Sequence, residues 1–189
     1  GHGRGGVGGR RHRDGLHGGR ERGLLAAHPG QDEGEGVVGV QIPVADGGDG
    51  LAEVLVSALH GVKRTALVTG PRGDPASASF CYVPARQLAA IEMATASGLA
   101  LLTKERLNPL LTTTRGTGEL IKAALDLGVA HLIVGIGGSA TNDGGIGMAA
   151  ALGARFLDEN GHPVEPVGGA LATIQHIDLS GLDPRLAEV

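Results

Sequence analysis

The segment that most constrains the fold runs from His131 to Asp158 and reads HLIVGIGGSATNDGGIGMAAALGARFLD. HLIVGIG is typical of a buried strand, and GMAAALGA is typical of a helix. Between them lies a loop in which glycines surround one amide and three oxygen-bearing side chains, Ser139, Thr141, Asn142 and Asp143. Strands that alternate with helices predict a parallel α/β sheet, and ligands of such sheets bind at the carboxyl ends of the strands.

A second loop, DGGDG at 46–50, has the same design. It follows VVGVQIPVA at 37–45, which the β-branched content predicts as a strand. It precedes LAEVLVSAL, where Leu51, Val54, Leu55 and Ala58 have helical spacing.

Glycine lets a backbone adopt positive φ and approach a ligand closely, and the first amides of a helix attract anions. Both loops are therefore predicted to bind a phosphate or a carboxylate, with Asp46 and Asp143 as the acids that take part in catalysis. The remaining predicted binding positions in the two loops are Gly47, Gly48, Asp49, Gly50, Gly137, Gly138, Ser139, Thr141, Asn142, Gly144 and Gly145. The alternative is structural: the aspartates cap helices and the glycines only form turns.

The residues between the two loops indicate a mixed arrangement. Short β-like runs at 63–69, 77–83 and 88–93 are joined in part by the turn GPRGDP, and a helix is predicted over TRGTGELIKAALDLG. Gly116 is the expected N-cap of that helix, and Gly128 is its expected left-handed C-cap. The predicted class is α/β, with a doubly wound, mostly parallel sheet, helices on both faces and a smaller mixed-strand portion of a second domain. The expected division is 37–61 in the first domain and 62–189 largely in the second.

Composition excludes several classes of function. Aromatic residues make up only 2% of the chain, which argues against stacking of single-stranded nucleic acid. The net charge of −4 gives no reason to expect a polyanionic partner for the body of the chain. A single cysteine, Cys81, allows no intramolecular disulfide and fits a reducing cytoplasm. No apolar run approaches the roughly 20 residues that cross a membrane.

Residues 1–36 differ from the rest, with 13 glycines, six arginines and four histidines. They carry too few apolar side chains to offset the entropy of ordering, so we expect an irregular, disordered segment. An alternative is that GRGGVGGRRHR is an RG-rich arm that binds RNA, within a protein that is not catalytic.

A dinucleotide-binding domain is a further alternative, because GIGGSA matches G-x-G-x-x-A and Asp158 lies near the position of a ribose-binding acid. The residues after this motif weaken the match. A Rossmann helix would already run through TNDGGIG, where three helical glycines would cost about 1 kcal/mol each.

Four blocks together resemble the signatures of the type I bacterial glycerate kinases: VADGGDG, EMATASGL, TTRGTGELI and VGIGGSATNDGGIGMAAALGARFLD. The resemblance runs from about Ile42 to Val189. It implies ATP-dependent, Mg²⁺-supported phosphorylation of D-glycerate, and two α/β domains with the active site in the cleft between them. Small molecules are thus the expected partners. Asp143 is the candidate Mg²⁺ ligand and Arg115 a candidate substrate-binding cation, although a surface role is open for the latter.

The chain departs from the family in two respects. Family members begin with a strand and a PDSFKGS loop, which residues 1–36 replace here, and the chain is well short of the family's length. We therefore expect an incomplete copy whose own activity is in doubt. A reading-frame change is one hypothesis for the origin of residues 1–36.

Overall fold

The computed structural model describes residues 44–45 and 47–189. All of them belong to the compact unit Gly36–Val189. The predicted strand at 37–45 lies almost wholly outside the described residues. The irregular segment 1–36, the RNA-binding arm and Asp46 lie outside them too.

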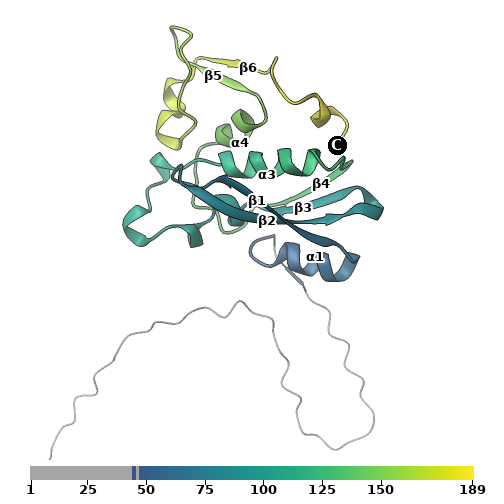
Figure 1. Ribbon diagram of the computed structural model, residues 1–189. Coiled ribbons are helices and arrows are strands. Elements are labelled where there is room, and N and C mark those ends of the chain that lie inside the picture. The colour runs from purple at the N-terminus through teal and green to yellow at the C-terminus, as the bar shows by residue number, and fades with distance from the viewer. Residues whose placement is uncertain (1–43, 46) are drawn as a thin grey trace, which may run out of the picture. The chain divides into compact units, whose positions relative to one another are not determined.

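The centre of the described structure is a four-stranded sheet (Figure 1). Its strands, in spatial order, are β1 (Val62–Thr69), β2 (Pro75–Val83), β3 (Leu88–Glu92) and β4 (His131–Gly135). The pairs β1–β2 and β2–β3 are antiparallel, whereas β3–β4 is parallel, with Ala90 opposite Ile133.

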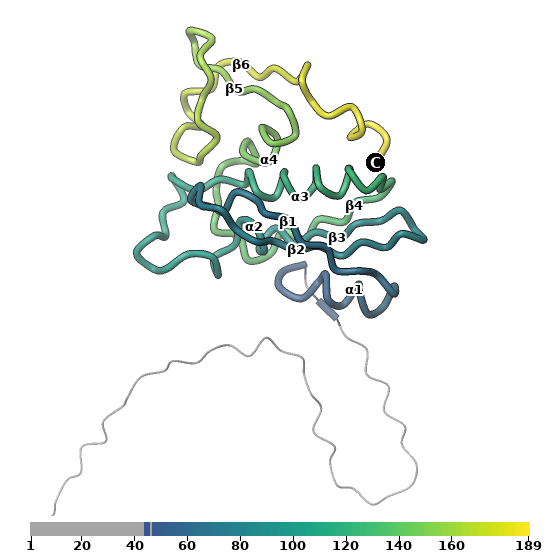
Figure 2. Tube along the Cα trace, in the orientation of Figure 1, coloured from purple at the N-terminus to yellow at the C-terminus, as the bar shows by residue number. Residues whose placement is uncertain are grey.

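Helices cover both faces of this sheet, because side chains alternate along each strand. On one face, Ala78 and Phe80 of β2 belong to the cluster that packs under α3 (Arg115–Leu125). On the other face, Cys81 and Val83 join Ala52 of α1 (Leu51–Leu59). Figures 1 and 2 show α1 on one side of the sheet and α3 on the other. Burial raises the pKa of the Cys81 thiol.

The predicted α/β class, with helices on both faces, is confirmed. The described sheet is mixed, however, with one parallel pair out of three. The reason lies in the connections: a tight turn, in which the Gly70 amide donates to the Asp74 carbonyl, forces β1 and β2 antiparallel. Only the β3–β4 connection is long enough to contain a crossover helix, α3.

The helices form where the apolar spacing predicts them, but they bury different residues. In α1 the packed residues are Ala52, Leu55, Val56 and Leu59, one position on from the predicted stripe. In α3 the N-cap is Thr114 rather than Gly116. Gly128 adopts the expected left-handed conformation, with φ of 72°, but the C-cap of α3 is Asp126.

Two further α-helices, six short 3-10 helices and a small sheet complete the described elements. The short helix α2 (Ala94–Ser97) follows β3, and α4 (Ile146–Ala151) packs against α3. β5 (Arg155–Leu157) and β6 (His176–Asp178) form a separate antiparallel pair.

The C-terminal segment is held to α3 by Arg185. Its guanidinium lies 2.8 Å from a carboxylate oxygen of Asp126 and 2.6 Å from one of Asp183. The hydrogen bonds from Arg185 lower the pKa of Asp183 to about 2.

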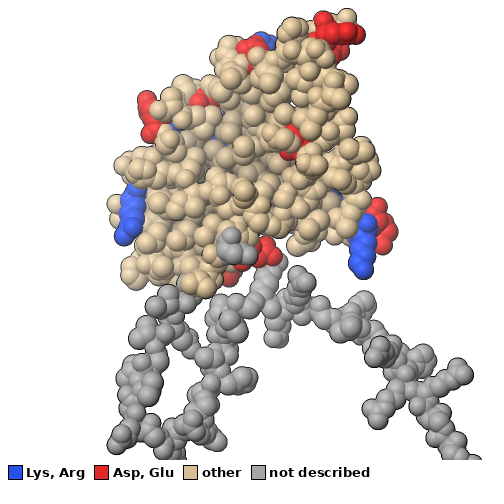
Figure 3. Space-filling model, turned by 180° about the vertical axis from the view of Figure 1, so that it is seen from behind, with Lys and Arg blue, Asp and Glu red and all other residues tan. Residues whose placement is uncertain are grey.

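The described surface carries few charges on the face seen in Figure 3, where isolated acidic and basic groups stand among uncharged side chains. Within the described ranges, no helix is both long enough and apolar enough to span a membrane. α1 packs directly against β2 and β3 across the expected domain boundary near residue 61. The boundary itself stays a prediction.

Candidate functional site

The two glycine loops meet each other at the carboxyl end of β4. The Gly137 amide donates to the Gly47 carbonyl at 3.1 Å. A β-carbon on Gly135 would lie 2.3 Å from the Gly47 carbonyl oxygen, and one on Gly137 would lie 2.7 Å from Cα of Gly48. Glycine is required at these positions because two backbones touch there. Gly47, Gly48 and Gly137 therefore shape the site through contact between the loops.

Asp143 is at the centre of the second loop and is only 1% exposed. One carboxylate oxygen accepts hydrogen bonds from the amides of Thr114 and Gly147, at 2.7 and 3.2 Å. The other accepts from the amide of Gly145 at 3.0 Å. The Thr114 hydroxyl approaches both oxygens, at 2.9 and 3.1 Å. Four donors thus satisfy the roughly four lone-pair positions of an ionised carboxylate.

Thr114 connects this carboxylate to two helices. It is the N-cap of α3, and its hydroxyl oxygen also accepts from the Met148 amide of α4 at 2.9 Å. A β-carbon on Gly147 would lie 2.2 Å from the Thr113 hydroxyl, so glycine is needed for α4 to come this close. The start of α3, the glycine loop and the start of α4 are consequently held as one unit around Asp143.

Beside the first loop, Glu92 is the buried carboxylate that accepts an amide at a helix start, as Asp143 does in the second loop. It ends β3, is 5% exposed, and accepts from the Ala52 amide in the first turn of α1 at 2.6 Å. Internal carboxylates therefore take amides at the start of α1 and of α4, where the sequence predicts that a ligand binds. At these amides the anion comes from the protein itself, and ligand binding by the other loop amides stays a prediction.

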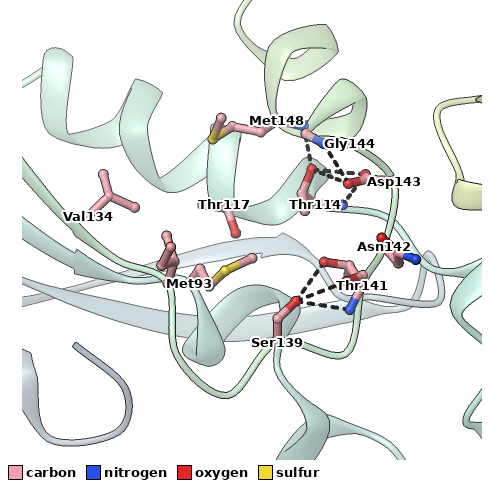
Figure 4. A pocket seen from close by; sticks show the side chains of 12 residues that line it. Met93, Thr114, Thr117, Val134, Ser139, Thr141, Asn142, Asp143, Gly144 and Met148 are labelled. Atoms are coloured by element: carbon pink, nitrogen blue, oxygen red, sulfur yellow. Dashed lines mark hydrogen bonds between the residues drawn. The ribbon is translucent and has the colours of Figure 1, made fainter. Parts of the chain in front are cut away.

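A pocket of about 330 Å³ opens beside the Asp143 unit (Figure 4). Its apolar walls come from Met93, Val134, Ile136 and Met148. Figure 4 shows the two methionines facing the pocket from opposite sides, with Thr117 between them. The other lining residues carry oxygen or nitrogen, or are glycines, and they are Thr114, Thr117, Ser139, Thr141, Asn142, Asp143, Gly144 and Gly145.

Hydroxyl groups at the pocket edge are paired with one another. Ser139 Oγ lies 2.9 Å from Thr141 Oγ1 and accepts from the Thr141 amide at 3.0 Å. Deeper down, the buried hydroxyls of Ser97 and Thr117 are 2.9 Å apart. The Ser139 hydroxyl also donates to the Thr141 carbonyl at 3.2 Å, so the Ser139–Thr141 pair fixes the backbone of the loop at the pocket edge.

The described residues do not by themselves form a Mg²⁺ site. Asp143 would have to give up hydrogen bonds to bind a metal, and no group of three His, Cys, Asp or Glu side chains converges within residues 44–45 and 47–189. The role of Asp143 as a Mg²⁺ ligand stays a prediction.

The other predicted residues fall into three groups. Ser139, Thr141, Asn142, Gly144 and Gly145 line the pocket, whereas Gly138 lies outside its lining and approaches α2, where a β-carbon would lie 3.2 Å from the Ala94 side chain. Asp49 and Gly50 lie at the start of α1, with Asp49 exposed. Arg115 is the first residue of α3 and is half-buried, outside the residues that line the pocket.

Sequence reasoning missed Glu92 and the pocket-lining residues outside the predicted loops, which are Met93, Thr114, Thr117, Val134, Ile136 and Met148. Glu92 and Met93 lie in EMATASGL, and Thr114 lies in TTRGTGELI, so the motifs contained the signal but not the contacts. The dinucleotide alternative loses its main support, because the loop continues past residue 141 and α4 begins only at Ile146.

The fold and the site together define an α/β protein with two glycine loops in contact at the end of a parallel strand pair, stabilised by internal carboxylates. The model of the glycerate kinase family matches residues 27–189, and the chain belongs to this family. The match begins upstream of Ile42, so the family region extends further towards the N-terminus than the four motifs indicate.

Several relatives show the extent of the similarity. Glycerate kinase of Bacillus subtilis strain 168 is 53% identical over 169 residues, which are 89% of this chain and 43% of the relative. Glycerate 2-kinase of Escherichia coli K12 is 53% identical over 149 residues, 79% of this chain and 39% of the relative.

A crystal structure assigned as glycerate kinase 2 from Salmonella typhimurium LT2 matches with a TM-score of 0.75 and 49% identity. The match covers 79% of this chain and 40% of that one. The chain thus spans about two fifths of the length of these relatives.

We predict that Asp143→Asn destabilises the described unit. An amide nitrogen would face backbone donors that now bind a carboxylate oxygen, so the free energy of unfolding should fall by about 3 kcal/mol. The measurement is a urea titration followed by the reactivity of the buried Cys81, the only thiol in the chain. Asp49→Asn, at an exposed position, is the matched control and should change stability by less than about 0.5 kcal/mol. Equal stability of the Asp143 variant and the wild type would contradict the central role of this carboxylate.

Proposed function

We propose that this chain is the part of a glycerate kinase that builds one wall of the active site, and that the protein transfers the γ-phosphoryl group of ATP to a hydroxyl of D-glycerate. The observation that supports this most is the Asp143 unit: a buried carboxylate that holds GGSATNDGG against TTRGTGELI. The two motifs are far apart in the sequence and both belong to the resemblance. Relatives named glycerate kinase share 53% identity over most of this chain.

Phosphoryl transfer needs mainly positioning and stabilisation of charge. The acceptor hydroxyl oxygen forms a bond to the γ-phosphorus, the bond to the ADP oxygen breaks, and the hydroxyl proton passes to a base or to solvent. A loop fixed before the ligands bind lowers the entropic cost of aligning these groups. Asp143 suits this task because its bonds hold Thr114, Gly145 and Gly147 in place.

We assign Asp143 first to positioning, since its carboxylate is engaged by four donors. The catalytic role predicted for Asp46 stays a proposal, and so do the roles of the loop glycines as ligand amides. Mg²⁺ commonly binds through one or two carboxylates together with the substrate phosphates. We therefore expect Mg²⁺ to enter together with ATP. We also propose a cytoplasmic location, which ATP as substrate and the single cysteine favour.

We predict that this segment supports glycerate phosphorylation when it replaces its counterpart in the Escherichia coli relative. The chimera should release ADP from Mg²⁺ and ATP only when D-glycerate is added, within about ten-fold of the unmodified relative, which is about 1.4 kcal/mol of barrier. The name of that relative favours the 2-hydroxyl as acceptor, and identification of the phosphoglycerate product tests this.

The 189-residue chain is assayed alongside the chimera, and the unmodified relative is the positive control. A folded chimera with no glycerate-dependent release of ADP would contradict the proposed function.

We also propose Arg115 as the cation that contacts the transferred phosphoryl group or the glycerate carboxylate. It follows Thr114 directly, so the Asp143 unit fixes its backbone, and its side chain is half-buried. In the chimera, Arg115→Ala should raise KM for ATP or D-glycerate at least about ten-fold, because a charge-assisted hydrogen bond is lost. Lys122→Ala, an exposed position on the same helix, is the control and should leave both constants unchanged. Unchanged KM values and kcat for the Arg115 variant would contradict a binding role and favour the alternative that Arg115 is only a surface charge.

A further inference from the structure

We propose that the pocket between Met93 and Met148 binds the purine base of the nucleotide, and that glycerate and the phosphates bind outside it. This inference rests on the proposed kinase function and says which of the two substrates the pocket takes. It is supported by the charge, the polarity and the shape of the lining.

Charge excludes the anionic parts of both substrates from the pocket. Among the described residues that line it there is no Lys, Arg or His, and the one ionisable side chain is Asp143. Asp143 is buried and its donors are engaged within the protein, so a phosphate or a carboxylate entering here would approach a negative charge without a cation to offset it.

Polarity favours an aromatic ring with hydrogen-bonding edges. Val134 and Ile136 are 36% and 75% exposed, so they present apolar surface that a ligand can cover. Glycerate has no extended apolar face, so the apolar surface of Val134 and Ile136 would stay exposed to water when it binds. A purine covers it with its faces and can still form hydrogen bonds through its edge.

The two methionines suit a flat ring. Thioether sulfurs make favourable contacts with aromatic rings, and the methionine side chain adapts to fill irregular space. Met93 is the N-cap of α2 and Met148 lies within α4, and they face the pocket from opposite sides (Figure 4). A volume of about 330 Å³ is within the usual range for small-ligand sites.

The pocket edge supplies a group that can read the base. Asn142 is exposed and carries both a donor and an acceptor, which is the combination that pairs with the edge of adenine. The Ser139 and Thr141 hydroxyls are bonded to each other and to the Thr141 backbone, so they hold this edge in place rather than offering a free donor. Amides of Gly145 and Gly147 are bound by Asp143, so Asn142, rather than the helix start, is available to a ligand.

The chain offers a direct test, because Met93 and Met148 are its only two methionines. The full 189-residue chain is prepared with ¹³C-labelled methionine methyl groups, and Met93→Leu and Met148→Leu variants assign the two signals. Adenosine, ATP, D-glycerate and tripolyphosphate are then titrated separately. We expect adenosine and ATP to shift both methyl signals and to give nuclear Overhauser effects between the purine protons and the methyl groups. D-Glycerate and tripolyphosphate should give neither.

A pair of variants tests the same pocket through affinity. Val134→Asp places a charge at the apolar wall and should weaken adenosine binding at least about ten-fold. Leu67→Asp, at a 78% exposed position on β1 outside the pocket lining, should leave adenosine binding unchanged.

Methyl shifts with D-glycerate and not with adenosine would overturn the assignment of the base, and so would a titration in which no nucleotide reaches the methionines. Calorimetry of ATP binding and the chimera assay separate this failure from failure of the proposed function. ATP binding or phosphoryl transfer without methyl contacts removes only the pocket assignment. Absence of transfer in the folded chimera removes the kinase proposal itself.

Discussion

The hydrogen bonds between the Asp143 carboxylate and Thr114 are the interaction on which the rest of the site depends. Without them, the start of α3, the glycine loop and the start of α4 would have no common anchor. The bonds are effective because the carboxylate is buried, so charge-assisted donors act at short range and water does not compete with them. The arrangement also explains the glycine at 147, where any side chain would collide with the Thr113 hydroxyl.

Internal carboxylates occupy helix-start amides beside the two glycine loops that could otherwise bind an anionic ligand. A helix start with free amides attracts an anion, and here Glu92 and Asp143 provide anions from within the protein. The second loop and the first turn of α1 are thereby anchored by carboxylates of the protein itself. Such preorganisation is what phosphoryl transfer demands of a protein, since it lowers the cost of alignment rather than supplying new covalent chemistry. The glycines serve the same purpose by allowing Gly47 and Gly137 to pair directly.

Local patterns in the sequence predict most of the elements, and long-range contacts explain where they fail. The apolar spacing of residues 51–59 predicts α1, and Gly128 has the expected left-handed conformation, because both signals depend on neighbours in the chain. The N-cap of α3 is missed because Thr114 is held at the start of the helix by hydrogen bonds to Asp143, which lies 29 positions away. The site has the same limit: the motifs point to residues around the pocket, but Met93 and Met148 line it together only in the folded structure. A glycine that approaches a ligand and a glycine that approaches another loop have the same sequence signature.

The most direct test of the Asp143 unit is amide hydrogen exchange in the wild type and in Asp143→Ala. The amides of Thr114, Gly145 and Gly147 should exchange slowly in the wild type, because each donates to the buried carboxylate. In the variant we expect these three to exchange at least about a hundred-fold faster, which is about 2.7 kcal/mol of local protection, while amides of β2 and β3 in the sheet remain protected. Unchanged protection of the three amides in the variant would contradict the account.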